Sequence, residues 1–109
     1  MAEEYKVLGQ SYPALTTLTD VYTVPAGKSA VISTITLCNR NSSALNMRLA
    51  VSPAGATIED KHYLSYGLPL QAGDTLSMTI GVTLAATDVL RVYTNAVGLS
   101  VNVFGTEIT

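Results

Sequence analysis

Residues 30–51 decide the fold, and they read AVISTITLCNRNSSALNMRLAV. Two runs of alternating apolar residues flank the polar cluster Asn39-Arg40-Asn41-Ser42-Ser43. Side chains of a β-strand point to alternate faces, so the pattern predicts two half-buried strands joined by a loop. Each of these strands has one apolar face that needs a second apolar layer to cover it. The stretch therefore predicts a protein made of two sheets.

The same alternation predicts which side chains of this stretch face the core. The expected inward positions are Val31, Ser33, Ile35 and Leu37 in the first run, and Leu45, Met47, Leu49 and Val51 in the second. Cys38, the only cysteine, follows Leu37 and is expected to be a small buried residue.

Turn-forming residues divide the rest of the chain into short segments with the alternation of strands. The clearest is 75–84, where apolar residues occupy every second position from Leu76 to Leu84, with Ile80 among the expected inward residues, and where Gly81 indicates a bulge or a close backbone approach. A further strand is expected from His62 to Tyr66, with Tyr63 on the face opposite to Tyr66.

About eight such segments occur at regular spacing, and none has a helical period. This arrangement predicts an all-β fold, an antiparallel two-sheet sandwich of about eight strands that is jelly-roll-like. Residues 1–16, which include Pro13, are expected to form an N-terminal arm or the first strand. Residues 17–109 are expected to form a single β-sandwich domain.

The composition is low in charge. Charged residues make up 13% of the 109 residues, against roughly 25% in a typical soluble domain. A polar surface with little charge suits packing against neighbouring subunits, so we expect an oligomer or larger assembly; a poorly charged monomer is the alternative. The six basic residues are scattered and the net charge is −2, which argues against a nucleic-acid partner. No apolar run approaches the roughly 20 residues of a membrane helix.

The residues that usually carry chemistry are few. His62 and Cys38 are each the only residue of their type, and neither lies in a catalytic motif. Glu59 and Asp60 lack the alternating oxygen ligands of a calcium loop, and the glycines are isolated in turns rather than grouped to bind phosphate. We therefore expect no enzymatic activity, no cofactor and no metal.

Six tyrosines accompany one phenylalanine and no tryptophan. Tyrosines can form an aromatic face suited to sugars or to a protein partner, or they can cover the edge of the core with their hydroxyls in water. The candidates for such a face are Tyr12, Tyr22, Tyr63, Tyr66 and Tyr93. The residues predicted to make interactions are Tyr5, Tyr12, Tyr63, Tyr66 and Arg40.

Several runs taken together resemble a pattern common in small structural proteins of tailed bacteriophages. These runs are Tyr22-Thr-Val-Pro-Ala-Gly-Lys28, Val31-Ile-Ser-Thr-Ile35, Cys38-Asn-Arg-Asn41, Gln71-Ala-Gly-Asp74, Leu84-Ala-Ala-Thr-Asp-Val-Leu90 and Phe104-Gly-Thr-Glu107. Each run alone is ordinary turn and strand sequence, and the resemblance lies in their order and spacing from Tyr22 onward.

The resemblance implies a non-enzymatic component of a virion, such as a capsid decoration (cement) protein. It implies a homo-oligomer, with a trimer favoured, whose partners are the major capsid protein or other virion proteins. The acidic start of the chain lacks the layout of a secretory signal, and the expected location is the virion after synthesis in the bacterial host cytoplasm. The alternative is a tail, baseplate or fibre component that binds a carbohydrate or a receptor.

Overall fold

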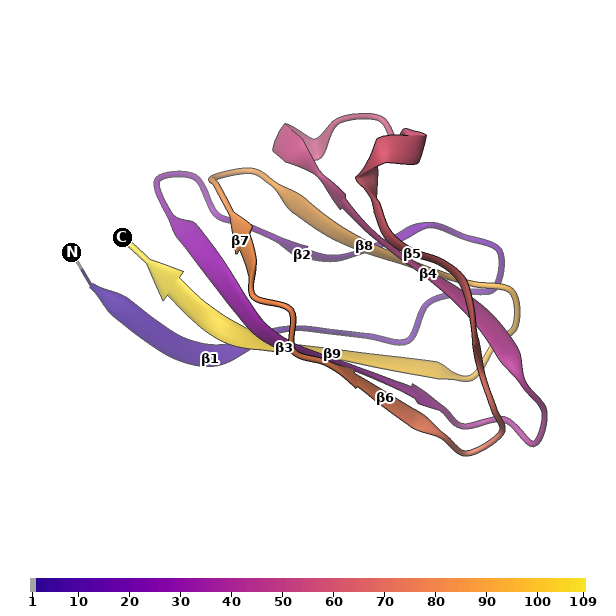
Figure 1. Cartoon of the computed structure of the whole chain (residues 1–109). Coiled ribbons are helices and arrows are strands. Elements are labelled where there is room, and N and C mark those ends of the chain that lie inside the picture. The colour runs from indigo at the N-terminus through magenta and orange to yellow at the C-terminus, as the bar shows by residue number, and fades with distance from the viewer. Residues whose placement is uncertain (1) are drawn as a thin grey trace.

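The computed structural model describes residues 2–109, which form two antiparallel sheets packed face to face (Figure 1). The strands are β1 (Glu3–Ser11), β2 (Thr19–Thr23), β3 (Ser29–Asn39), β4 (Leu45–Ser52), β5 (Tyr63–Leu70), β6 (Thr75–Met78), β7 (Val82–Leu84), β8 (Val89–Thr94) and β9 (Leu99–Ile108). Two short 3-10 helices, η1 (Pro53–Gly55) and η2 (Asp60–His62), lie between β4 and β5. Among these residues no helix is long and apolar enough to cross a membrane.

The strand order is that of a jelly roll. The first sheet has the order β1-β9-β3-β6, with β7 also paired to β3, and the second has the order β2-β8-β4-β5. The first four strands therefore pair with the later strands in reverse order: β1 with β9, β2 with β8, β3 with β6 and β7, and β4 with β5. The chain is one long antiparallel ribbon that turns back at residues 53–62 and is rolled into two sheets. The predicted all-β, jelly-roll-like sandwich is confirmed, with β6 and β7 together taking one strand position.

The core is the apolar layer between the sheets. Its fully buried side chains come from both sheets and include Ile32, Ile35, Leu37, Leu45, Met47, Leu49, Leu90, Val92, Leu99, Val101 and Val103. Because these side chains pack across one shared interface, neither sheet has a core of its own.

A β-bulge in β3 reverses the predicted faces at its start. Ile32 pairs with Gly105 and Thr34 pairs with Phe104, so Ser33 is an extra residue with no partner on β9. Because of this extra residue, the buried positions before the bulge have the opposite parity to those after it. Ile32 is buried, whereas Val31 and Ser33 are not. The predicted inward positions of Val31 and Ser33 are therefore wrong, whereas those of Ile35 and Leu37 are confirmed.

The segment 75–84 is not one continuous strand. It is interrupted between β6 and β7, opposite the bulge in β3, and Ile80 in the interruption is 47% exposed instead of inward. Gly81 has a φ of +62°, a conformation that favours glycine, and open space where a Cβ would lie. Gly81 is therefore explained by its backbone angle and not by a close backbone approach.

Strand β5 also differs from its prediction. It runs from Tyr63 to Leu70, beyond the expected end at Tyr66. Its register with β4 shifts on either side of Ser65 and Tyr66, which pair with Leu49 and Arg48. The shift near Leu64 places Tyr63 and Tyr66 on the same face, so the prediction of opposite faces is wrong.

Most of residues 2–16 form the first strand, β1, which is paired within the sandwich and is not a free arm. Strand β1 pairs with β9 from Glu3 to Ser11. At Gly9 it approaches β2 so closely that a Cβ would lie 2.5 Å from the carbonyl oxygen of Val21. This contact closes one side of the sandwich.

Cys38 is half-buried, so the prediction that it is buried is wrong. Its neighbours Leu37 and Asn39 face the core, so Cys38 lies on the outer face of the sheet beside Thr75 and Ser100.

Candidate functional site

A cluster of three tyrosines and one arginine covers part of the outer face of the second sheet. The guanidinium carbon of Arg48 lies 4.2 Å from the ring centre of Tyr66 and 4.3 Å from that of Tyr93. The rings of Tyr63 and Tyr66 meet edge to face, with centres 4.9 Å apart and planes at 86°. We call Arg48, Tyr63, Tyr66 and Tyr93 the tyrosine–arginine cluster.

Strand pairing positions this cluster. Arg48 of β4 is directly opposite Tyr66 of β5 on one side and Tyr93 of β8 on the other. A cation over an aromatic face is attracted by the negative charge of the ring. No ion pair within residues 2–109 involves Arg48, so the rings are its main electrostatic partners in the described chain.

Beside the cluster lies an open depression of about 480 Å³ lined by Asp60, Tyr63 and Tyr66. Asp60 belongs to η2, which lies immediately before β5. Tyr66 is 64% exposed although Arg48 covers part of its ring. The depression thus combines open aromatic surface with a carboxylate.

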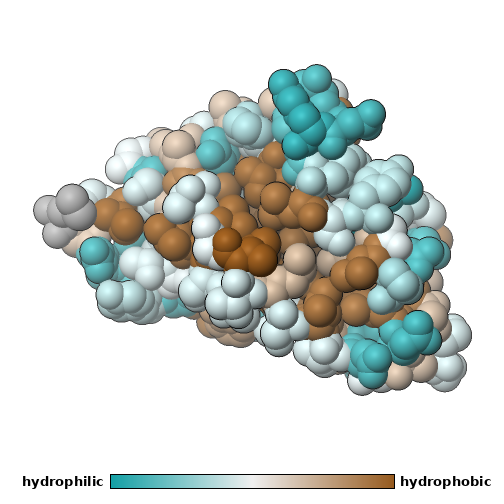
Figure 2. Space-filling view, viewed as in Figure 1, coloured by the Kyte–Doolittle hydropathy of each residue, from teal (hydrophilic) through white to brown (hydrophobic). Residues whose placement is uncertain are grey.

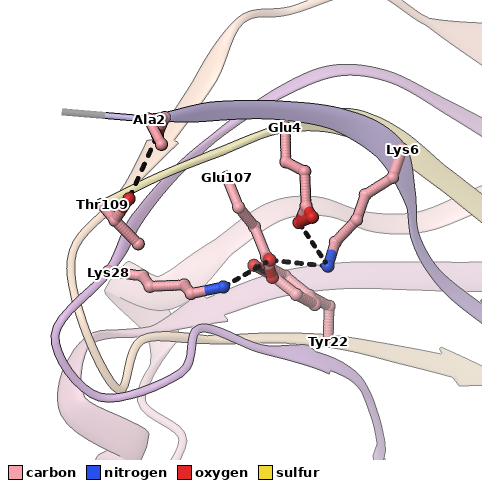
Figure 3. A network of polar contacts seen from close by, with 7 residues as sticks. All are labelled: Ala2, Glu4, Lys6, Tyr22, Lys28, Glu107 and Thr109. Atoms are coloured by element: carbon pink, nitrogen blue, oxygen red, sulfur yellow. Dashed lines mark hydrogen bonds and ion pairs between the residues drawn. The ribbon is translucent and has the colours of Figure 1, made fainter.

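A second polar group, Glu107, is buried near the chain termini (Figure 3). One of its carboxylate oxygens, Oε2, accepts a hydrogen bond of 2.6 Å from the Tyr22 hydroxyl. The other, Oε1, lies 2.7 Å from the ammonium of Lys6 and 3.5 Å from that of Lys28. These contacts join β9 of the first sheet to β1, to β2 of the second sheet and to the loop before β3.

The electrostatics of this network favour its charged form. Hydrogen bonds from Lys6 and Tyr22 hold the pKa of Glu107 below the ordinary value of 4.5, against the opposing effect of burial. Burial, followed by the bond to Glu107, raises the pKa of the Tyr22 hydroxyl well above its ordinary value. The hydrogen bond to Glu107 likewise raises the pKa of Lys6. Since both carboxylate oxygens are already bound, the network acts as a tie between the two sheets.

Asn39 makes a third buried polar site, at the opposite end of β3. Its side-chain nitrogen lies 3.0–3.1 Å from the carbonyl oxygens of Ser43, Leu70 and Gln71, and its side-chain oxygen accepts a bond from the backbone of Asn41. Asn39 therefore ties the β3–β4 loop of one ribbon half to the β5–β6 connection of the other.

The outer face of the first sheet is uncharged where β1, β9, β3 and β6 run side by side. One row across it is Gln10–Asn102–Thr36–Ser77, and the side chains of Gln10 and Asn102 are joined by a 2.7 Å hydrogen bond. We call the following residues the uncharged face: Val7, Gln10, Thr34, Thr36, Cys38, Thr75, Ser77, Ser100, Asn102 and Phe104.

Apolar surface is exposed on the side of the sandwich opposite to the Gly9 contact. Figure 2 shows a hydrophobic band there, in the region between β7 and β5. Leu64 and Ile80 are 45% and 47% exposed. Leu68, Leu76, Met78 and Val82 are partly buried against the core. The sandwich is therefore closed along β1 and β2 and has its core partly accessible along β5 and β6–β7.

The predicted interaction residues do not form one site. Tyr63 and Tyr66 lie together in the cluster, but Tyr5 and Tyr12 belong to the part of the chain around β1, at 79% and 53% exposure. Arg40 is exposed in the β3–β4 loop. Tyr22, included in the proposed aromatic face, is buried against Glu107.

The sequence patterns single out none of three important residues, although two of them carry a signal. Asn39 continues the inward parity of Ile35 and Leu37, and Glu107 continues that of Val101 and Val103. A polar residue at an apolar parity indicates a buried polar tie. Arg48 lies between the inward positions Met47 and Leu49, so the alternation places it on the outer face, but its stacking on Tyr93 depends on the pairing of β4 with β8, which the sequence does not reveal.

No group of three or more metal-ligating side chains comes together in the part of the chain that the structure describes.

Comparisons of this chain with protein-family models, with curated proteins and with solved structures find no match.

Proposed function

We propose that this chain is a structural subunit of a virus particle, most simply a capsid decoration protein. It would act by packing against copies of itself and against other particle subunits. The observation that carries the proposal is the uncharged face on a rigid sheet. The sequence resemblance to small phage structural proteins agrees with it, as does the jelly roll, an architecture that viral capsid proteins share with unrelated proteins.

The physical argument concerns the cost of burying a surface in an interface. Charged groups lose hydration when buried and need matching partners, and the cores of interfaces are depleted of them. The hydroxyl and amide groups of Thr36, Ser77 and Asn102 can exchange water for a neighbour's polar groups at lower cost. A paired sheet is ordered before it binds, so little further conformational entropy is lost on association.

The copy number of the protein per purified particle, relative to the major capsid protein, tests this function. We expect quantitative mass spectrometry to give a ratio near one or a simple fraction of it. A handful of copies would instead favour the tail, baseplate or fibre alternative. Absence from purified particles would overturn the structural function.

The interface itself is tested by placing charge on the uncharged face. The double substitution Thr36→Lys with Ser77→Lys should prevent incorporation into particles and weaken self-association in sedimentation analysis. Thr57→Lys, in the exposed loop before η2, is the matched control and should behave as the unmodified protein. Incorporation of the double variant at the normal level would show that partners bind elsewhere.

A further inference from the structure

We propose that the depression beside Asp60, Tyr63 and Tyr66 binds one pyranose unit of a neutral polysaccharide. This site lies on the second sheet, away from the uncharged face, and it does not depend on the structural function proposed above. Its ligand class is inferred from the open aromatic ring and the carboxylate that line the depression, and from the cation that is stacked on that ring.

The aromatic platform is Tyr66. The C–H bonds on one side of a pyranose ring form an apolar surface with slight positive charge, which packs favourably on the negative face of an aromatic ring. Tyr66 is 64% exposed, yet its ring is held by Arg48 at 4.2 Å and by Tyr63 at 4.9 Å. Because the ring is already positioned, binding would cost little side-chain entropy.

The polar groups around the platform match the hydroxyls of a sugar. Within residues 2–109 the carboxylate of Asp60 makes no ion pair, so its oxygens can accept hydrogen bonds from hydroxyls. The tyrosine hydroxyls both donate and accept. A volume of about 480 Å³ falls within the roughly 300–1,000 Å³ of small-molecule sites.

The charges favour a neutral sugar over an ionic ligand. The carboxylate of Asp60 opposes the carboxylate of an acidic sugar. The guanidinium of Arg48 already occupies part of the Tyr66 ring and opposes a second cation there. A neutral polyol meets neither repulsion and can use the donors and acceptors together.

The test is a titration of the isotope-labelled protein, followed by backbone amide NMR shifts. The probes are glucose, galactose, mannose, N-acetylglucosamine and oligosaccharides built from them, with choline as a cationic comparison. We expect saturable shifts at residues 60–66 with at least one sugar, at a dissociation constant on the order of millimolar. Tyr66→Ala should weaken this binding at least about tenfold, and Asp60→Ala should also weaken it.

Tyr12→Ala is the matched control, since Tyr12 is an exposed tyrosine outside the cluster, and it should bind as the unmodified protein does. The amide spectrum of each variant reports whether the fold is retained. Three results would each overturn the proposal: no saturable shift with any sugar, unchanged binding by Tyr66→Ala, or binding of choline in place of sugars. None of these results bears on incorporation into particles.

Discussion

Buried polar side chains at core positions connect the two halves of the rolled ribbon. Glu107 and Asn39 are 4% and 0% exposed, and each contacts segments far from it in the sequence. A buried polar group is costly unless its hydrogen bonds are made, and only the native arrangement supplies these partners. Such residues therefore favour one specific pairing of strands over alternatives that bury apolar surface equally well.

Replacing Glu107 by Gln should lower the free energy of unfolding by about 1–3 kcal/mol at neutral pH, because the charge-assisted bonds to Lys6 and Tyr22 are lost. Its folded-state pKa lies below the unfolded value, so its stabilisation is present above the unfolded pKa. That stabilisation is lost as the pH falls through the folded pKa. Urea denaturation at a series of pH values should show a weaker acid dependence in Glu107→Gln.

The exposed Glu3 provides the control for this measurement. Glu3→Gln should retain both the stability and the acid dependence of the unmodified protein. An acid dependence in Glu107→Gln equal to that of the unmodified chain would contradict the role of the buried carboxylate.

Replacing Asn39 by Ala should cost about 2–4 kcal/mol, because three backbone carbonyl groups and one backbone N–H lose their shared partner. Thermal and urea unfolding measure this loss. Asn46→Ala is the matched control, since the side chain of Asn46 is exposed and its bond to Asn95 uses the backbone nitrogen. Similar stability of Asn39→Ala and Asn46→Ala would show that the hydrogen bonds of Asn39 do not stabilise the fold.

At the scale of elements, irregularities in neighbouring strands of the first sheet lie side by side. The extra residue Leu8 in β1 and the extra residue Ser33 in β3 both adjoin Phe104 of β9, and the break at 79–81 lies on the other side of β3. Bulges bend strands and increase their twist. A row of them lets this sheet curve over the core as one unit.

Gly105 lies on β9 beside the bulges of β1 and β3, and a glycine is required there. A Cβ at position 105 would overlap the carbonyl oxygen of Val31 and crowd Ile32 on the neighbouring strand. Gly105→Ala should therefore lower the free energy of unfolding by about 1–3 kcal/mol, as overpacking does. Thr106→Ala, at the adjacent half-buried position, should cost less. Denaturant titration of both variants checks the prediction, and equal stability would contradict it.

Strand β1 is needed for the fold, because it pairs with β9 along its length and its Gly9 closes the sandwich against Val21. Deleting residues 2–12 should abolish cooperative thermal unfolding, measured by circular dichroism and amide NMR spectra. A truncated chain that melts cooperatively and keeps dispersed spectra would show instead that this segment acts as a detachable arm.

At the scale of the whole molecule, the two ends of the ribbon meet and its turning point is a loop. Ala2 and Thr109 exchange backbone hydrogen bonds at the end of the β1–β9 ladder (Figure 3). The ribbon turns at residues 53–62, in the region of η1 and η2. Neighbouring termini and an exposed loop are the conditions under which a chain tolerates circular permutation.

A permutant whose ends are joined by a short Gly/Ser linker and opened between Thr57 and Ile58 should fold and unfold cooperatively. The matched permutant opened between Ile32 and Ser33, inside β3, should not fold, because it divides the strand that pairs with β6, β7 and β9. Circular dichroism melts distinguish the two. Failure of the first permutant with an otherwise soluble chain would show that the turning point is needed for folding.

The sequence by itself determined the class of the fold. The alternation in residues 30–51 and the turn residues between the other segments are local signals, and local signals suffice to predict short strands and two apolar layers. They also predicted the inward positions Leu45, Met47 and Leu49 of β4 and those of the second half of β3. The prediction for the end of β4 is wrong, because Val51 is only half-buried whereas Ala50 and Ser52, at the opposite parity, are buried. Tyr63 and Tyr66 are candidate interaction residues from their residue type alone, because the alternation predicts opposite faces for them.

Only the tertiary structure decided which strands are neighbours and where each ladder slips by a residue. An extra residue such as Ser33 or Leu64 is defined only against the partner strand, and that partner is distant in the sequence. Such a slip changes the face of every side chain beyond it. The contact of Tyr63 with Tyr66, the stacking of Arg48 and the bonding partners of Glu107 all follow from these long-range pairings, and no local pattern contains them.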